Sequence, residues 1–468
     1  RLDASWRPHT QRGARAARAF ATEETACPKT WSTLCRRLVR EGRLDVVGGG
    51  WVSHDEATTP VDLAAAQYDE GMRTVRALFF DREETDRERE TDGGGRSGGV
   101  EDVTEPSKIA WQIDPFGHAA ATPTVLSLMG FEVVVLNRVP AVIKRQMIRE
   151  NAREFTWKSS SRFGNNDDDD AVEQKASGED SRVYAHVLRA HYNVPPELDF
   201  ENRRFTVVAG EDGKVRDDES LTRAAAALLK TAKAASRGVT HGHALVLVGD
   251  DFRFVDANFT FGAWRDVLDR VSSEKPHSSA IGHERGTRDA NAKSTAHPRR
   301  FGAFGEPKKH ERNKVFAASS PPLRFRWSTP REYFASASRA VETRSNREGS
   351  FPSRRGSFFP YADNFPASEN AWVGSFVARR ALKDAVLEAA TSAVVASSFA
   401  ASVFFSGSST RSKPRDVFVD ASLARNVTAA RRDGFLGLHH DAITGTDSQF
   451  VANDFSHRLQ KAEDKSNL

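Results

Sequence analysis

The segment KIAWQIDPFGH, Lys108 to His118, places a carboxylate at the end of a short apolar run. The run predicts a buried strand that ends at Asp114, because Pro115 cannot donate to a strand ladder and disfavours helical geometry in the residue before it. In α/β folds, ligands and catalytic groups gather at the carboxyl ends of strands. Asp114, with Phe116 and a histidine beside it, is therefore a candidate for a sugar or metal site. The alternative is an Asp-Pro turn that only closes the strand.

Other apolar segments also end in polar groups. We expect strands at 44–49 before Asp55-Glu56, 108–113 before Asp114, 131–137 before Arg138, 244–249 before Asp250-Asp251, and 323–328 before Thr329-Pro330. Helices are expected between them, at 59–79, 120–129, 219–235 and 331–342. This alternation is typical of a mostly parallel sheet covered on both faces. The charged groups would then meet at one edge of the sheet, unless each residue only caps its own strand.

From about residue 367 the pattern changes to helices without strands, at 372–403, 417–438 and 447–464. These three segments predict a small helical bundle. The bundle carries GLHHDAITGT, Gly437 to Thr446. Neighbouring histidines on a helix point about 100° apart, so only one of them can face a given site. A histidine beside a carboxylate is a common metal-ligand arrangement, and a purely structural histidine pair is the alternative.

Composition excludes few classes of protein. The 468 residues are 38% hydrophobic, enough for a large core, and 68 Lys and Arg nearly balance 64 Asp and Glu. A net charge of +4 is a weak indication of a nucleic-acid partner, and we expect none. No continuous apolar run reaches the roughly 20 residues that span a bilayer, so we expect no membrane segment. Cys27 and Cys35 are spaced unsuitably for a metal pair or a disulfide.

The motifs occur in the order found in the α-mannosidases of glycoside hydrolase family 38, which include Golgi mannosidase II and the lysosomal and vacuolar enzymes. Five segments carry the resemblance: GGGWVSHDEA (48–57), WQIDPFGH (111–118), VGDDFRF (248–254), FFPYADN (358–364) and LHHDAITGT (438–446). Weaker matches lie at 154–160, 186–196, 328–334 and 372–382. The chain resembles the family over most of residues 30–468.

The resemblance implies a zinc-dependent, retaining exo-α-mannosidase that acts on N-glycans or free mannosides in the lumen of the secretory pathway, either Golgi or lysosome and vacuole. Matched position by position, Asp114 takes the place of the nucleophile and of a zinc ligand, and His440 that of another zinc ligand. Asp251 takes the place of the general acid/base, with Asp250 beside it. The positions matching the substrate-binding residues are Trp111, Phe116, Arg138, Tyr192 and Asp441.

The resemblance also suggests a domain organisation. Residues 1–29 match nothing in the family, 30–366 form the catalytic α/β domain with an irregular barrel-like sheet, and 367–468 form the three-helix bundle. Four stretches of the catalytic domain lack the apolar content to offset their ordering entropy and are expected to be surface loops. They are 83–104, 159–181, 272–320 and 344–357.

The chain departs from the family in two respects. The family takes two of its four zinc ligands from a His-x-Asp-Pro-Gly-Trp motif, which does not occur in these 468 residues. The family's large C-terminal β-rich region has no counterpart either, and the first residue is Arg1 rather than Met, so we expect an N-terminally incomplete sequence. The alternative function is therefore that of an inactive remnant or a mannose-binding pseudoenzyme.

Overall fold

The computed structural model describes residues 29–80, 103–159, 181–201, 217–254, 256–273, 323–348, 352–363, 371–406 and 421–466. Two compact units are present. Unit 1 comprises Arg1–Val194, Lys230–Asp251 and Ser328–Leu468, and unit 2 comprises Pro195–Leu229 and Phe252–Trp327. The elements in chain order are α2 (Lys29–Arg40), α3 (Val61–Phe79), β1 (Ile109–Gln112), α5 (Thr122–Leu128), β2 (Val133–Leu136), α6 (Ala141–Arg149), β3 (Glu154–Lys158), β4 (Arg182–Val187), η2 (Pro196–Leu198), α7 (Asp218–Ala235), α8 (Ala257–Ser273), α9 (Pro330–Glu348), β5 (Ser353–Arg354), η3 (Gly374–Phe376), α10 (Arg380–Ser406), α11 (Ala421–Leu436) and α12 (Gln449–Ser466).

The sheet of unit 1 confirms the expected mostly parallel α/β class. Its strand order is β1-β2-β4-β3-β5, and each pairing is parallel except that of β3 with β4. Alternate residues of β1 and β2 face opposite cores, so that Ala110 and Val134 belong to one apolar cluster and Ile109 and Val133 to another. In the described residues β1 and β5 are the two ends of this sheet, and the expected barrel-like closure does not form there.

Three of the expected strands are wrong. Residues 44–49, 244–249 and 323–328 form no strand in the described structure. In the first, Gly48 and Gly49 have φ values of 91° and 69°, which lie outside the range of regular strands, although the Gly48 N–H still donates to the Ile109 carbonyl at 2.9 Å. In 244–249, Leu245 and Leu247 pack partly buried on the core beside β1 and β2 without joining their ladder. Apolar content predicted burial here, but not pairing.

The helices were predicted more accurately, because each has an apolar face with helical spacing. The expected helices 59–79, 120–129, 219–235 and 331–342 correspond to α3, α5, α7 and α9. At the start of α9, Thr329 and Glu332 form a reciprocal capping box, with both side-chain contacts at 3.4 Å. The loop expected at 344–357 is wrong in part, since α9 continues to Glu348 and β5 pairs with β3. The other three expected loops lie almost entirely outside the described residues.

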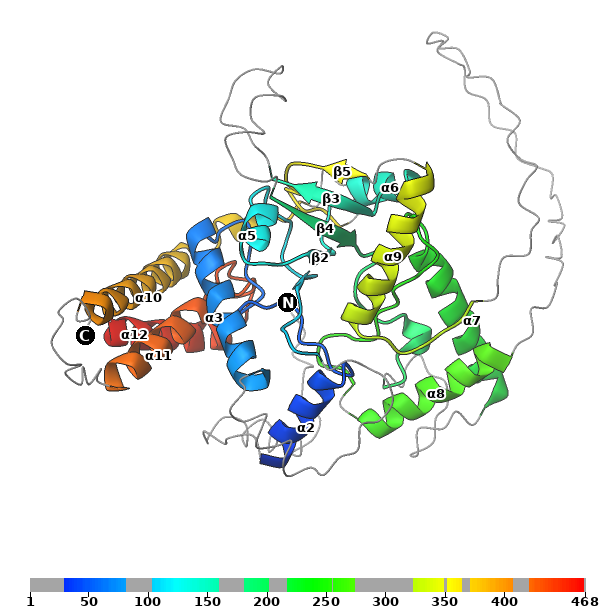
Figure 1. The fold of residues 1–468 in the computed structure, drawn as a ribbon, viewed down its shortest axis with the longest axis horizontal. Helices are drawn as coiled ribbons and strands as arrows, with labels where there is room; N and C mark the ends of the chain where they lie inside the picture. The colour runs from blue at the N-terminus through cyan, green and yellow to red at the C-terminus, as the bar shows by residue number, and fades with distance from the viewer. Residues whose placement is uncertain are drawn as a thin grey trace, which may run out of the picture. The chain divides into compact units, whose positions relative to one another are not determined.

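The three expected C-terminal helices are confirmed as α10, α11 and α12, which lie side by side (Figure 1). Val386 and Ala389 of α10 pack with Phe435 at the end of α11 and Leu459 of α12. Contrary to the expectation from continuous apolar runs, residues Arg380–Ser402 of α10 form one helix long and apolar enough to cross a membrane. Core helices of soluble proteins share this length and composition, and Val386 and Ala389 of α10 are buried in the bundle.

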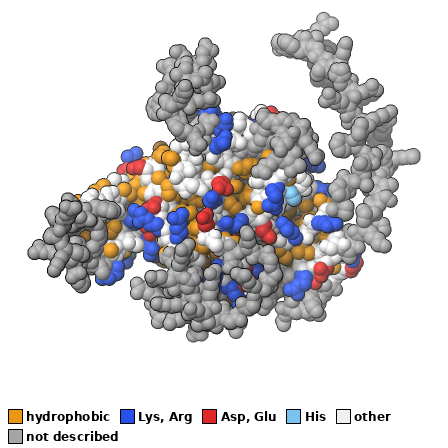
Figure 2. All heavy atoms as spheres, in the orientation of Figure 1, with side chains coloured by type: hydrophobic (Ala, Val, Ile, Leu, Met, Phe, Trp, Pro, Cys, Tyr) orange, Lys and Arg blue, Asp and Glu red, His pale blue; other side chains and the backbone are white. Residues whose placement is uncertain are grey.

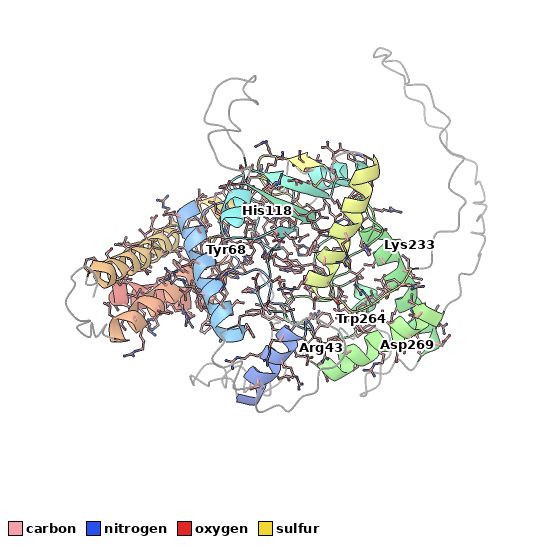
Figure 3. All side chains as sticks on the ribbon, in the orientation of Figure 1. Arg43, Tyr68, His118, Lys233, Trp264 and Asp269 are labelled. Atoms are coloured by element: carbon pink, nitrogen blue, oxygen red, sulfur yellow. The ribbon has the colours of Figure 1, made fainter. Side chains whose placement is uncertain are left out.

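Unit 2 has a small core of its own. Trp264 of α8, labelled in Figure 3, packs edge-on against Phe200, with ring centroids 5.5 Å apart. Glu201 accepts hydrogen bonds from the backbone N–H of Phe254 at 2.7 Å and from the Thr260 hydroxyl at 2.7 Å, which ties the start of α8 to the segment before α7. On the face of the molecule in Figure 2, basic and acidic side chains are interspersed, in keeping with the balanced composition.

Candidate active site

Asp114 lies in the turn that follows β1, as the sequence predicts. Gly117 gives this turn its shape: its φ is 108°, and a Cβ there would lie 2.5 Å from the Phe359 ring. Arg138 follows β2, the parallel neighbour of β1. Its Nε donates to Asp114 Oδ1 at 2.7 Å, and its Nη2 donates to the same oxygen. Parallel pairing thus brings the predicted carboxylate and the predicted guanidinium together at one edge of the sheet.

Three aromatic rings surround the Arg138 guanidinium. Its central carbon lies 5.3 Å from the ring centre of Phe116, 5.6 Å from that of Tyr361 and 5.0 Å from that of Trp372. Such contacts attract the cation to the negative faces of the rings and restrict its motion. Phe116 is only 3% exposed, so its ring packs against Arg138 and does not offer an open face to a sugar.

His440 binds the other oxygen of Asp114. Its Nε2 lies 2.9 Å from Asp114 Oδ2, and its Nδ1 donates to the Ser53 carbonyl at 2.7 Å. A carbonyl can only accept a hydrogen bond, so the Nδ1 proton is fixed and Nε2 directs its remaining proton or lone pair at the carboxylate. This nitrogen–oxygen pair therefore needs a proton or a cation between the two atoms.

The charges around Asp114 keep it ionised. Burial alone would raise the pKa of Asp114, but the hydrogen bond from His440 and the charge of Arg138 outweigh burial and lower that pKa to about 2. Burial would lower the pKa of His440, and its contacts with Asp114 and the Ser53 carbonyl outweigh that effect and raise it. The Asp114 carboxylate therefore lies between the Arg138 guanidinium and the His440 ring.

Tyr192 lies beside the second predicted carboxylate. Its hydroxyl lies 3.5 Å from Asp251 Oδ2, and burial together with the charges of Asp114 and Asp251 raises the pKa of Tyr192. Asp250 is held differently, because its Oδ1 accepts from Asn193 Nδ2 at 2.5 Å and from the Asp251 N–H at 2.8 Å. Asp251 therefore faces the Tyr192 hydroxyl, while Asp250 fixes the backbone of its neighbour.

Two of the other predicted residues lie less directly at this site. Trp111, on β1, packs partly buried against the apolar cluster that contains Ile109 and Val133. Asp441 Oδ1 accepts from the Thr446 hydroxyl at 2.7 Å, which closes the turn after α11. Both positions remain predictions as sugar-binding residues.

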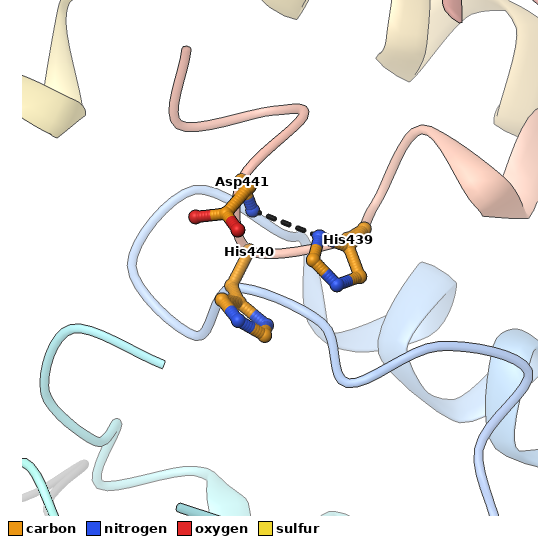
Figure 4. Close-up of side chains that lie close together, drawn as sticks. All are labelled: His439, His440 and Asp441. Atoms are coloured by element: carbon orange, nitrogen blue, oxygen red, sulfur yellow. Dashed lines mark hydrogen bonds between the residues drawn. The ribbon is translucent and has the colours of Figure 1, made fainter. Parts of the chain in front are cut away.

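The donors that could hold a metal come from one turn and from Asp114. His439, His440 and Asp441 have ligand atoms within 4.8 Å of one another (Figure 4). However, His439 Nδ1 accepts from the Asp441 N–H at 3.0 Å, so its Nε2 carries a proton and cannot bind a metal without losing it. His440 Nε2 and Asp114 Oδ2 are thus the fitting donors, and His440 Nδ1 is bound to a backbone carbonyl, as is usual for metal-bound histidines. They supply two of the four zinc ligands that the resemblance implies.

Sequence reasoning missed the residues that hold these groups in place. Ser53, Tyr361 and Trp372 contact His440 or Arg138 directly. Each lies in a segment that carries the family resemblance, namely GGGWVSHDEA, FFPYADN and WVGSFVARRAL. Their place in the motifs was the available signal, but a backbone carbonyl and aromatic packing leave no pattern of their own in a sequence.

Comparison with known proteins shows which enzymes this chain resembles. Residues 100–283 match the family model described as glycosyl hydrolases family 38 N-terminal domain. α-Mannosidase F of Dictyostelium discoideum is 24% identical over 91% of this chain and 32% of its own length. Lysosomal α-mannosidase of Cavia porcellus is 25% identical over 91% of this chain and 32% of its own length. The chain thus spans about a third of the length of these relatives.

A solved structure agrees with this at the level of the fold. The chain aligns with the crystal structure of an α-mannosidase from Enterococcus faecalis V583 with a TM-score of 0.52 and 12% sequence identity. The alignment covers 92% of this chain and 34% of the chain in that structure. The matched region contains the turn that bears Asp114, its partner Arg138 and the Asp250-Asp251 pair. Residues 100–283 are thus similar to the N-terminal domain of glycoside hydrolase family 38, and the chain is similar to the α-mannosidases over about nine-tenths of its length.

Proposed function

We propose that the protein containing this chain is a retaining exo-α-mannosidase in which Asp114 is the nucleophile and Asp251 the general acid/base. The observation that carries this proposal is the Asp114 carboxylate, which Arg138 and His440 hold ionised, together with Asp251, whose Oδ2 lies 3.5 Å from the Tyr192 hydroxyl. Retaining glycosidases need two carboxyl groups on either side of the bond that they cleave, one ionised and one able to give a proton.

The reaction then has two steps. A carboxylate oxygen of Asp114 attacks the anomeric carbon while the bond to the leaving oxygen breaks, and Asp251 gives its proton to that oxygen. Asp251 next takes a proton from a water molecule whose oxygen attacks the same carbon. The bond to Asp114 breaks, and mannose leaves with its original anomeric configuration. Arg138 and the surrounding rings hold the nucleophile in place during both steps.

Zinc belongs to this proposal as a cofactor. Asp114 Oδ2 and His440 Nε2 would hold it, and it would act as a Lewis acid that binds the hydroxyl groups of the terminal mannose. The proposed substrates are terminal α-mannosides of N-glycans or free oligosaccharides. The lysosomal α-mannosidases among the relatives support a place in the lumen of the secretory pathway, in Golgi or lysosome and vacuole.

The first test is substitution of the nucleophile. We expect the full-length protein to cleave an aryl α-mannoside, with activity lost on chelation and restored by zinc. Asp114→Ala should lower kcat by at least about 1,000-fold, because no other group can form the glycosyl bond. Asp433→Ala is a matched control, since this aspartate pairs with Lys465 in the helical bundle. Full activity of the Asp114 variant would refute the assignment of the nucleophile.

A second candidate function is mannose binding without hydrolysis. The donors of the described residues favour it, because Asp114 Oδ2 and His440 Nε2 are two ligands, and two ligands alone hold zinc weakly. Calorimetry with methyl α-mannoside separates the candidates when combined with the activity assay. Saturable binding together with an activity no higher than that of Asp114→Ala would support the binding protein.

A further inference from the structure

A buried carboxylate outside the reacting groups holds the turn that bears Asp114. Glu56 is 7% exposed, and its side chain lies between β1, the turn after β1 and the start of α5. The family resemblance assigns no role to Glu56. A buried carboxylate is costly unless it is fully hydrogen-bonded, so its partners indicate what it does.

Glu56 binds both ends of the turn. Gln112, the last residue of β1, donates its amide to Glu56 Oε1 at 3.3 Å. His118, at the other end, places Nδ1 2.8 Å from the same oxygen. Asp114 projects from the five residues between these two contacts. His118 lies in the interior, beside α5 (Figure 3), and among the described residues its Nε2 has no hydrogen-bond partner, so Glu56 is the polar anchor of this ring.

The second oxygen of Glu56 extends the same support. Oε2 accepts from the Ala119 N–H at 2.8 Å and from the hydroxyl of Thr122, the first residue of α5. Burial would raise the pKa of Glu56, but His118 and the other donors outweigh burial and lower it, so the group carries its charge. Four donors from three neighbouring segments therefore converge on one carboxylate.

The same network reaches His440 on the other side of Asp114. The Ser53 hydroxyl donates to Gln112 Oε1 at 3.0 Å, and the Ser53 carbonyl accepts the Nδ1 proton of His440. Ser53 and Glu56 belong to a single short segment, residues 53–56. That segment therefore sets the position of the turn bearing Asp114 and also the orientation of the histidine that binds Asp114.

We infer that Glu56 is a positioning residue, which fixes the turn from Gln112 to His118 so that Asp114 meets Arg138 and His440. Its importance for catalysis rests on the proposed function of Asp114, but its effect on the geometry does not. A displacement of about 1 Å of a reacting group can cost roughly 100-fold in rate. The loss of Glu56 should therefore lower kcat more than it changes KM.

The test compares three variants of the full-length protein. Glu56→Gln removes the negative charge of the side chain. Gln112→Met removes the hydrogen bonds that join Glu56 and Ser53 to β1, and it buries no new charge. If Glu56→Gln does not fold, Gln112→Met tests the inference by itself. Glu70→Gln is the matched control, because Glu70 is 4% exposed and pairs with Arg431 at 3.0 Å and with Arg432 at 2.9 Å. We expect a 10- to 100-fold loss of kcat on an aryl α-mannoside at nearly constant KM for the first two variants, and none for the control.

A second readout does not depend on hydrolysis. Nitrogen-15 NMR of the histidine rings, with His440 assigned by comparison with His440→Asn, reports on the contact between His440 and Asp114. We expect this signal to shift in Glu56→Gln and Gln112→Met and to stay in place in Glu70→Gln. If the wild-type protein is inactive, the proposed function fails and this signal alone decides the inference. Folded Glu56→Gln and Gln112→Met proteins with an unchanged His440 signal would overturn it, as would an unchanged kcat in an active enzyme.

Discussion

Arg138 contributes both its charge and its shape to the site. Two of its nitrogens donate to one oxygen of Asp114, and three aromatic rings contact its guanidinium. A lysine offers one compact ammonium group, which cannot reproduce a planar fork held between rings. The arrangement therefore depends on arginine itself, and a substitution that keeps only the charge should not preserve it.

We accordingly expect Arg138→Lys to lower kcat/KM on an aryl α-mannoside about 10- to 100-fold, because Asp114 loses its orientation. Arg380→Lys is the control, since Arg380 pairs with Asp384 on the exposed surface of α10. Steady-state kinetics on both variants, with circular dichroism to confirm folding, provide the measurement. Equal activity of Arg138→Lys and wild type would show that charge alone suffices.

At the scale of elements, Arg153 and Glu154 attach the end of α7 to the sheet. The Arg153 side chain donates to the carbonyls of Ala235 and Arg237, at the C-terminus of α7, and to that of Val187 on β4. Glu154 of β3 lies 2.7 Å from His186 Nδ1 on β4 and 2.7 Å from His241 Nε2. The segment that leads to Asp250 and Asp251 begins at this histidine, so the contacts fix its starting point.

These contacts explain why β3 and β4 were not predicted as strands. A glutamate and a histidine in a short segment indicate an exposed face, but Glu154 and His186 are cross-strand partners that satisfy each other in the interior. The end of β1 was predictable because apolar residues stop at Asp-Pro. Likewise, Asp114, Arg138 and His440 could be found from motifs. The contacts of Glu56 and the Ser53 carbonyl could not, since they depend on how distant segments pack.

We expect Arg153→Met to reduce the free energy of unfolding by about 3–5 kcal/mol, because the change leaves buried carbonyls unpaired and Glu154 without its neighbouring cation. Arg458→Met should change it by less than about 0.5 kcal/mol, since Arg458 forms an exposed pair with Asp454 within α12. Urea unfolding followed by circular dichroism measures both. A loss below 1 kcal/mol for Arg153→Met would contradict the role of this side chain.

At the scale of the whole molecule, buried histidines make stability depend on pH. Burial lowers the pKa of His54 to about 4 and that of His439 to about 4, and it also lowers the pKa of His186 and His191. The unfolded chain protonates these histidines below about pH 6.5, whereas His54 and His439 of the folded protein take up a proton only near pH 4. His440, whose pKa is raised, acts in the opposite direction.

The net expectation is that stability falls as the pH drops from about 6.5 to about 4, and that His54 alone accounts for about 3 kcal/mol of the loss. Asp114 and Glu154, whose pKa values are lowered by folding, reduce the stability further only at lower pH. Their contribution begins to be lost below the pKa of an unfolded carboxyl group. Urea unfolding at pH 7, 5.5 and 4 tests this, with His54→Gln expected to depend less on pH. Stability that rises toward pH 4 would disprove the account.

The contact between His440 and Asp114 joins residues 326 positions apart, and the contact of His440 with Ser53 joins residues 387 apart. Closing such long loops slows folding, because chain entropy must be lost before the contact forms. During synthesis, the turn bearing Asp114 leaves the ribosome long before α11 and its histidines exist. A chain whose synthesis stops before His440 therefore cannot form the contact that holds Asp114 between Arg138 and His440.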